Sequence, residues 1–329
     1  MTLFPVAEYW WFYLGFTVFV LAMLAIDLGV FHRKAHEVSA REAAKWSVFW
    51  VTLSLVFNVL FLRYASAEFS PEIGREVALQ FLAGYVVEYT LSIDNMFVFV
   101  VIFSFFSVPS VLQHRVLFYG ILGALLFRAV FIALGSVLLS YQAVVVLFGV
   151  VLMLTGARML WHDPAQASPD RNPLVRLTRR LVPITPDFQG KRFFTRIQGR
   201  LHATPLFLAL MAIEMSDIVF AIDSVPAIFA LTREPLIVFT SNVFAILGLR
   251  SLYFVLAAAV ARFTLLRYGL AGVLIFIGLK MVWLNPAFDG HFPIVWSLAI
   301  IATLVGGSIA ASLLVDLARE KPRDRHRIS

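Results

Sequence analysis

Acidic residues interrupt two of the long apolar segments of this sequence. The first segment carries Glu88 and, six residues later, the pair Asp94-Asn95. The second carries a denser set that consists of Glu214, Asp217, Asp223 and Ser224. An ionisable side chain at the centre of a bilayer costs about 2.5–3.5 kcal/mol on insertion scales, so such a residue in a membrane helix usually has a function. Carboxylate, amide and hydroxyl oxygens together are suitable ligands for a hard divalent cation.

The spacing of these residues constrains the helices that carry them. Two residues six apart lie about 120° apart around a straight helix. Glu88 and Asp94 therefore face one point only if their helix is bent or partly unwound. In the second segment, Pro226 removes one helical hydrogen bond and frees a backbone carbonyl beside Asp223. We therefore expect side-chain and backbone oxygens to gather at membrane depth, where irregular backbone is tolerated if it lines a cavity.

Two further apolar segments contain arginine. Arg128 lies in one of them, and Arg250 lies in the other together with Asn242. One interpretation is that both arginines pair with the acids and only hold the helices together. The interpretation that we favour divides the acids: these three residues keep some carboxylates ionised and oriented, and the remaining carboxylates bind a cation.

The sequence contains no cysteine, and its seven histidines lie in loops or at the ends of apolar segments. Disulfides, thiolate metal sites and cysteine nucleophiles are therefore excluded. A site built only from oxygen ligands suits Mg²⁺, Ca²⁺ or Mn²⁺ better than Zn²⁺ or Cu⁺. We expect no bound cofactor and no enzymatic activity. A remote alternative is an intramembrane aspartyl protease that uses Asp94 and Asp223, but the Tyr-Asp and Gly-x-Gly-Asp contexts of that class are absent.

Composition and segment length predict an all-α, polytopic membrane helix bundle. The chain has 329 residues, of which 60% are hydrophobic and 14% are charged, whereas a soluble domain has about 25% charged residues. A bilayer core of about 30 Å needs roughly 20 apolar residues in a helix. Nine stretches meet this length, at residues 10–31, 46–63, 77–106, 116–139, 143–161, 204–230, 236–260, 267–284 and 293–316.

The basic residues predict how the chain is oriented in the membrane. Most of the 27 lysines and arginines lie in the segments that follow the first, third, fifth, seventh and ninth stretches. With nine spans these segments share one side, which the positive-inside rule makes the cytoplasm. The N-terminus is then outside and the C-terminus is cytoplasmic. This distribution accounts for the net charge of +7, so we expect the lipid bilayer and a divalent cation as partners and no nucleic acid. The oligomeric state stays open.

The sequence repeats itself. Matching positions are residues 156–161 with 278–283 and Arg128 with Arg250, both at a shift of 122, and Asp94 with Asp223 at a shift of 129. Each unit contains three predicted helices, and an odd number of spans inverts the second unit relative to the first. Inverted repeats are typical of secondary transporters, which bind their substrate between the repeats near the midplane. Whether Glu88 corresponds to Glu214 or to Asp217 stays open.

These observations divide the chain into five parts. They are two N-terminal transmembrane helices (1–70), the first three-helix repeat (71–161), a basic cytoplasmic linker (162–202), the second repeat (203–285), and the last transmembrane helix with a basic cytoplasmic tail (286–329). The linker is rich in proline, aspartate and arginine. We interpret it as a solvated connector, and a short amphipathic helix near 174–182 at the membrane surface is the alternative.

Three blocks, at residues 88–98, 214–230 and 240–254, resemble the TerC family of integral membrane proteins, in particular its Alx-like branch. The resemblance extends over nearly the whole chain. It implies a bacterial inner-membrane protein of the LysE-like transporter superfamily that exports Mn²⁺. The seven candidate metal ligands, all on matching positions, are Glu88, Asp94, Asn95, Glu214, Asp217, Asp223 and Ser224.

The sequence therefore leads to two main hypotheses about function. In the first, cytoplasmic Mn²⁺ binds the carboxylates between the repeats and leaves when one repeat rocks against the other, with protons displacing the metal. In the second, the protein is a membrane scaffold associated with stress response, redox balance or tellurite resistance, without transport. Stabilisation of the purified protein by metal, lost in aspartate variants, would separate the two.

Overall fold

The computed structural model describes residues 2–26, 39–138, 141–161, 182–257, 265–288 and 292–320. Within these ranges the side chains of Ala40, Asp94, Phe97, Asp223 and 316–320 are not described. In this part of the chain nine helices are long and apolar enough to cross a membrane. The predicted all-α membrane bundle with nine spans is therefore confirmed.

The spanning helices follow one another in the predicted order. They are α1 (Val6–Ile26), α2 (Ala40–Glu68), α3 (Pro71–Phe105), α4 (Ser110–Leu138), α5 (Gln142–Trp161), α7 (Pro205–Phe229), α8 (Pro235–Ala257), α9 (Leu266–Leu279) and α11 (Ile294–Glu320). After α9 the chain continues through a π-helical turn (Lys280–Leu284) into the short α10 (Asn285–Ala287).

Several helices begin earlier than hydropathy predicts, because their start signals precede the apolar stretch. The Ser70 hydroxyl accepts a hydrogen bond from the Ile73 N–H at 3.3 Å, and Pro71 occupies the first turn of α3. Serine at the N-cap and proline at the first position are favourable helix starts. The apolar stretch that we identified begins one to two turns further along the helix.

Neither helix that carries the acidic residues is interrupted. α3 is one continuous helix that passes through Glu88 and the backbone of Asp94. α7 likewise continues through Pro226 to Phe229. Partial unwinding at these residues is therefore not observed, and a bend without a break stays a prediction. Because Pro226 lies in the last turn of α7, the missing hydrogen bond does not end the helix early.

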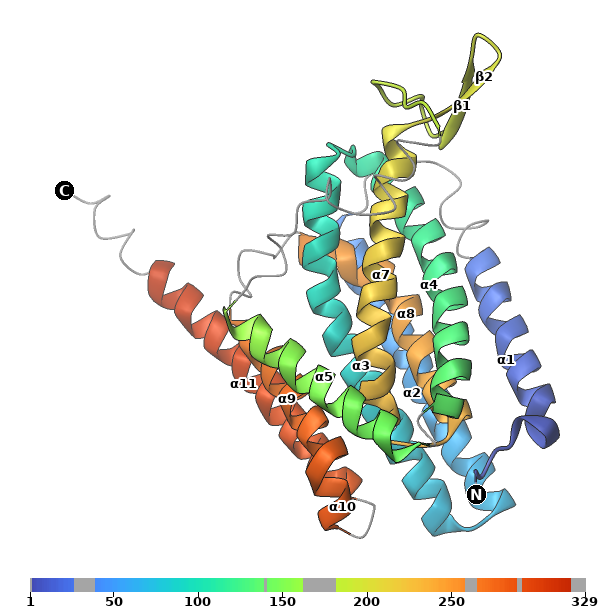
Figure 1. The fold of residues 1–329 in the computed structure, drawn as a ribbon, viewed down its shortest axis with the longest axis vertical. Coiled ribbons are helices and arrows are strands. Elements are labelled where there is room, and N and C mark those ends of the chain that lie inside the picture. Colours follow the sequence, from blue (N-terminus) through green and yellow to red (C-terminus); the bar gives the residue numbers. More distant parts are fainter. Residues whose placement is uncertain are drawn as a thin grey trace.

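The helices pack in two groups that contact each other. α3 packs against α2 and α8, and α4 packs against α7 and α8. α5 packs along α9, which also contacts α11, and these three helices form an inclined group beside the others (Figure 1). α8 is the most enclosed span, with most of its side chains buried. It therefore lies where contacts from both halves of the chain converge.

The linker contains structure that the sequence analysis missed. Strands β1 (Phe194–Ile197) and β2 (Arg200–Ala203) form an antiparallel hairpin that projects beyond α7 at one end of the bundle (Figure 1). Gln198 and Gly199 both have positive φ, as a two-residue hairpin turn requires. Four-residue strands are too short to give a clear alternating pattern. Residues 162–181, which include most of the alternative amphipathic helix, lie outside the described residues.

Candidate functional site

An ion pair between α3 and α4 lies at the centre of the bundle. Arg128 Nη1 donates to Glu88 Oε1 at 2.7 Å and to Asn242 Oδ1 on α8, also at 2.7 Å. The exposed fractions of Glu88, Arg128 and Asn242 are 0%, 3% and 0%. Arg128 thus joins three helices through charge-assisted hydrogen bonds, which are shorter and stronger than bonds between neutral groups.

Glu88 has a second partner on its own helix. The Ser92 hydroxyl, one turn further along α3, donates to Glu88 Oε1 at 3.3 Å. The other carboxylate oxygen, Oε2, is buried and has no hydrogen-bond partner among the described side chains. One oxygen of Glu88 is therefore held by protein groups, and the other has no described partner.

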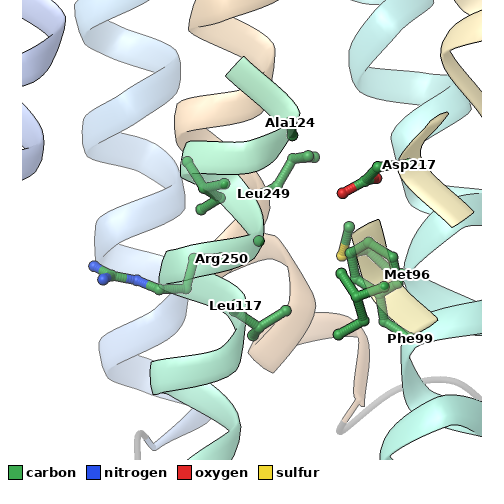
Figure 2. A pocket seen from close by; sticks show the side chains of 10 residues that line it. Met96, Phe99, Leu117, Ala124, Asp217, Leu249 and Arg250 are labelled. Carbon is green, nitrogen blue, oxygen red and sulfur yellow. The ribbon is translucent and has the colours of Figure 1, made fainter. Parts of the chain in front are cut away.

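Asp217 on α7 lies close enough to this ion pair to interact electrostatically with Arg128 and with Glu88. It is buried, with 7% of its surface exposed. No hydrogen bond or ion pair joins its carboxylate to another described side chain. Figure 2 shows this carboxylate pointing into a small cavity, whereas the guanidinium group of Arg250 points away from it. Asp217 is therefore an acid at membrane depth without a direct basic partner in the described part of the protein.

The cavity beside Asp217 is lined mainly by apolar side chains of α3, α4, α7 and α8. It has room for about one water molecule, and a bare divalent cation is smaller than that. The sulfur of Met96 also lies at its wall (Figure 2). The lining residues are Met96, Phe99, Leu117, Gly120, Ile121, Ala124, Ile213, Asp217, Leu249 and Arg250.

Glu214, one turn before Asp217 on α7, lies directly against Gly123 of α4. A Cβ atom added at Gly123 would collide with both carboxylate oxygens of Glu214. Glu214 is 8% exposed, and its Oε2 is buried without a hydrogen-bond partner among the described residues. The missing side chain at Gly123 therefore gives this carboxylate its place between the two helices.

The structure describes the remaining candidate ligands in less detail. Asn95 and Ser224 are buried, with exposed fractions of 6% and 2%, and the Ser224 hydroxyl has no described hydrogen-bond partner. The side chains of Asp94 and Asp223 are not described. Among the side chains that are, no group of three or more histidine, aspartate or glutamate residues is arranged to hold a metal ion. The complete seven-residue ligand set therefore stays a prediction.

Two residues of this site were missed by the sequence analysis. Ser92 lies four residues after Glu88, so its hydrogen bond could have been predicted from helical spacing. Gly123 gave no such signal, because glycine in an apolar helix usually marks close helix packing. Its role depends on which face of α7 is turned toward α4.

The fold and this buried polar network define a polytopic membrane protein with ionisable groups inside its helix bundle. A family model described as "Integral membrane protein TerC family" matches residues 73–320. The chain belongs to this family.

The chain is also similar to bacterial membrane proteins over nearly its full length. It is 50% identical over 301 residues to "Uncharacterized membrane protein STKORF319" of Myxococcus xanthus, covering 91% of each chain. It is 44% identical over 312 residues to "Putative membrane-bound redox modulator Alx" of Escherichia coli K12, covering 94% of this chain and 96% of that protein. It is 37% identical to an "Uncharacterized membrane protein" of Rickettsia bellii, covering 91% and 96%. No solved structure matches this chain.

Proposed function

We propose that this protein is a divalent-cation transporter of the bacterial inner membrane, and that it exports Mn²⁺. The observation that carries the proposal is the contrast between Glu88, which Arg128 neutralises at 2.7 Å, and Asp217, whose carboxylate points into a cavity without such a partner. An unpaired carboxylate at membrane depth is costly, and a cation that binds there offsets the cost.

The chemistry of the available ligands supports a hard cation. Beside Asp217 lie Glu214 and Glu88, each with one buried carboxylate oxygen that has no described partner. Ser224 and Asn95 supply neutral oxygens on the same two helices. Mn²⁺, like Mg²⁺ and Ca²⁺, prefers such oxygen ligands. Asp94 and Asp223 stay in the proposed ligand set on their sequence positions alone.

Helix packing supports an inverted repeat as the frame for transport. If α3, α4 and α5 correspond to α7, α8 and α9, then the observed α3–α8 and α7–α4 interfaces are one interface seen twice. The α5–α9 interface is reciprocal as well. A Cβ atom added at Gly156 would meet the carbonyl oxygen of Ala271, and one added at Gly278 would meet that of Gly149. Gly278 lies 122 residues after Gly156, and Gly149 lies 122 residues before Ala271. The two contacts therefore correspond to each other under the repeat.

The position of the cavity supports entry of the cation from the cytoplasmic side. It lies between the Glu88–Arg128 pair and the bundle end that carries the β1–β2 hairpin. This end adjoins the basic linker that we assign to the cytoplasm, which places the N-terminus outside and the C-terminus inside. A cytoplasmic cation would then meet Asp217 before it crosses the midplane, and protons from outside would displace it.

The test is Mn²⁺ flux in proteoliposomes that contain the wild-type protein or single variants. We expect Asp217→Asn to reduce the initial rate at least tenfold, and we expect the same of Asp94→Asn and Asp223→Asn. Arg158→Gln, an exposed position on α5, should retain the wild-type rate. Wild-type flux in folded Asp217→Asn protein would refute the proposed site.

The printed names of several relatives favour a second candidate, a membrane protein that modulates redox state. Since this sequence contains no cysteine, such an effect here would not use a thiol of the chain. The two candidates differ in a property of the isolated protein. A transporter should be stabilised against heat by Mn²⁺, and the stabilisation should be lost in Asp217→Asn.

A further inference from the structure

The segment that precedes α1 is bound to the loop between α7 and α8. The backbone N–H of Leu3 donates to Glu234 Oε1 at 2.8 Å, and the N–H of Phe4 donates to Glu234 Oε2 at 3.2 Å. Glu234 is a loop residue, yet only 8% of its surface is exposed. A buried carboxylate that accepts from two consecutive backbone amides fixes the position of the segment that carries them.

The same loop is connected to the first half of the chain. The N–H of Glu234 donates to the Thr232 hydroxyl at 3.2 Å, and that hydroxyl donates to Gln80 Oε1 on α3 at 2.5 Å. Gln80 also donates to Glu76 at 3.0 Å. One continuous chain of hydrogen bonds therefore joins α3, the α7–α8 loop and residues 3 and 4.

Phe4 fills the space beside this chain of hydrogen bonds. Its side chain is completely buried, and its ring lies 5.2 Å from the ring of Tyr9, 5.4 Å from that of Phe61 and 5.5 Å from that of Phe69. By contrast, Trp10 in the first turns of α1 is 59% exposed. Phe4 thus packs as a core residue although it precedes the first helix.

These contacts lie at the bundle end opposite the cavity. The cavity lies toward the ends of α3 and α8 at Phe105 and Ala257, whereas Glu234 precedes the first residue of α8 and Gln80 lies in the first half of α3. The Glu88–Arg128 pair lies between the two. Figure 1 shows the N-terminus at the end away from the β1–β2 hairpin.

We propose that residues 2–5, which Glu234 anchors and Phe4 packs against α1 and α2, form a gate that closes the outer end of the transport path. This inference rests on the proposed transport function. Gln80 belongs to the first repeat, and Thr232 and Glu234 belong to the second, so rocking of one repeat against the other breaks the hydrogen-bond chain. A closed outer gate together with a cavity toward the inner end corresponds to a carrier in a conformation closed to the outside.

Access to a single thiol below the gate tests this proposal without any metal. Ser241 on α8 is fully buried against Gly84 of α3, and it lies seven residues, about 10 Å, along the chain from Glu234. Ser241→Cys is nearly isosteric and creates the only thiol in a sequence without cysteine. A membrane-impermeant charged maleimide should modify this thiol slowly when residues 2–5 are docked.

We expect Phe4→Ala and Glu234→Ala, each combined with Ser241→Cys, to increase the rate of modification at least tenfold. The matched control Trp10→Ala should leave the rate unchanged. Glu234→Gln retains a neutral hydrogen-bond acceptor and should keep the rate within about threefold of the parent, which separates gate opening from misfolding. Equal rates in all four variants, with melting temperatures that show folded protein, would overturn the gate.

Flux measurements distinguish failure of the gate from failure of the transport proposal. If the parent protein moves no Mn²⁺ and the thiol rates still differ as expected, the gate is supported and Mn²⁺ transport is refuted. If the parent moves Mn²⁺ and the thiol rates do not differ, transport stands and the gate falls. With both correct, Phe4→Ala should also change the rate of Mn²⁺ release.

Discussion

Glu88 and Asp217 lie on α3 and α7, near the same arginine, yet their surroundings differ. Glu88 is bonded to Arg128 and to Ser92. Asp217 is bonded to neither and faces a cavity lined mainly by apolar side chains (Figure 2). The comparison teaches that two acids in related helices need not share a role. The first is bonded to the surrounding helices, and the second is the carboxylate that we propose binds the cation.

The difference follows from where Arg128 can reach. Its guanidinium group uses one nitrogen for both Glu88 and Asn242, so its shortest contacts join α3, α4 and α8. Asp217 experiences Arg128 only as a nearby charge. Removing one partner of a buried ion pair leaves an uncompensated charge, whereas removing a carboxylate beside a cavity does not.

The largest expected effect on stability follows from Arg128→Gln. This change leaves Glu88 buried without its counter-ion, which costs about 3–5 kcal/mol in the free energy of unfolding. Arg158→Gln at an exposed position of α5 should change it by less than about 0.5 kcal/mol. Denaturant unfolding of both variants in detergent gives the two values. Similar losses in both would show that the pair does not hold the framework together.

A smaller loss is expected from Gly123→Ala. The added methyl group forces the Glu214 carboxylate to move, and overpacking of this kind costs about 1–3 kcal/mol. It should also weaken Mn²⁺ binding, because Glu214 leaves its place beside Asp217. Gly306→Ala is the matched control, because nothing lies within 4 Å of an added Cβ there. If the two variants unfold and bind alike, Glu214 is not held by Gly123.

The third prediction separates binding from stability. Asp217→Asn should lower Mn²⁺ affinity at least tenfold, about 1.4 kcal/mol, with little change in unfolding. Glu88→Gln should mainly lower stability, because Arg128 then lacks its counter-ion. Calorimetric titration with Mn²⁺ and thermal unfolding of both variants measure the two quantities. The opposite assignment would reverse the roles that we give to the two acids.

The smallest effect concerns Glu234 and pH. Burial raises the pKa of its carboxyl group above the ordinary value of 4.5, although the N–H groups of Leu3 and Phe4 partly oppose this. The carboxyl group of Glu234 therefore binds its proton more tightly in the folded protein than in the unfolded chain. The stabilising contribution of this protonated carboxyl group is complete below pH 4.5 and is lost as pH rises through the raised pKa. Of the groups around Glu234, Tyr13 also interacts with it electrostatically.

The difference in melting temperature between the wild type and Glu234→Gln reports this contribution. It should favour the wild type most at low pH and shift toward the glutamine variant as pH rises above 4.5. A difference that does not change with pH would mean that the stability of the protein does not depend on ionisation of Glu234.

The sequence alone determined the nine spans, their order and the positions of three acids that the structure shows buried, Glu88, Glu214 and Asp217. These properties are local, because the length of an apolar stretch and the cost of a charge in lipid depend on neighbouring residues only. Helix ends were less certain, since capping residues such as Ser70 lie outside the apolar stretches. The β1–β2 hairpin was missed for a different reason, since strands of four residues are too short to show an alternating pattern.

The tertiary structure alone decided which acid meets which base. Arg128 bonds to Asn242, 114 residues away, and Leu3 bonds to Glu234, 231 residues away. Such pairs depend on how each helix is rotated and which face it turns to its neighbour. Spacing within one helix fixes only which residues share a face. The sequence could therefore supply the candidates, and packing chose between an ion pair at Glu88 and an open carboxylate at Asp217.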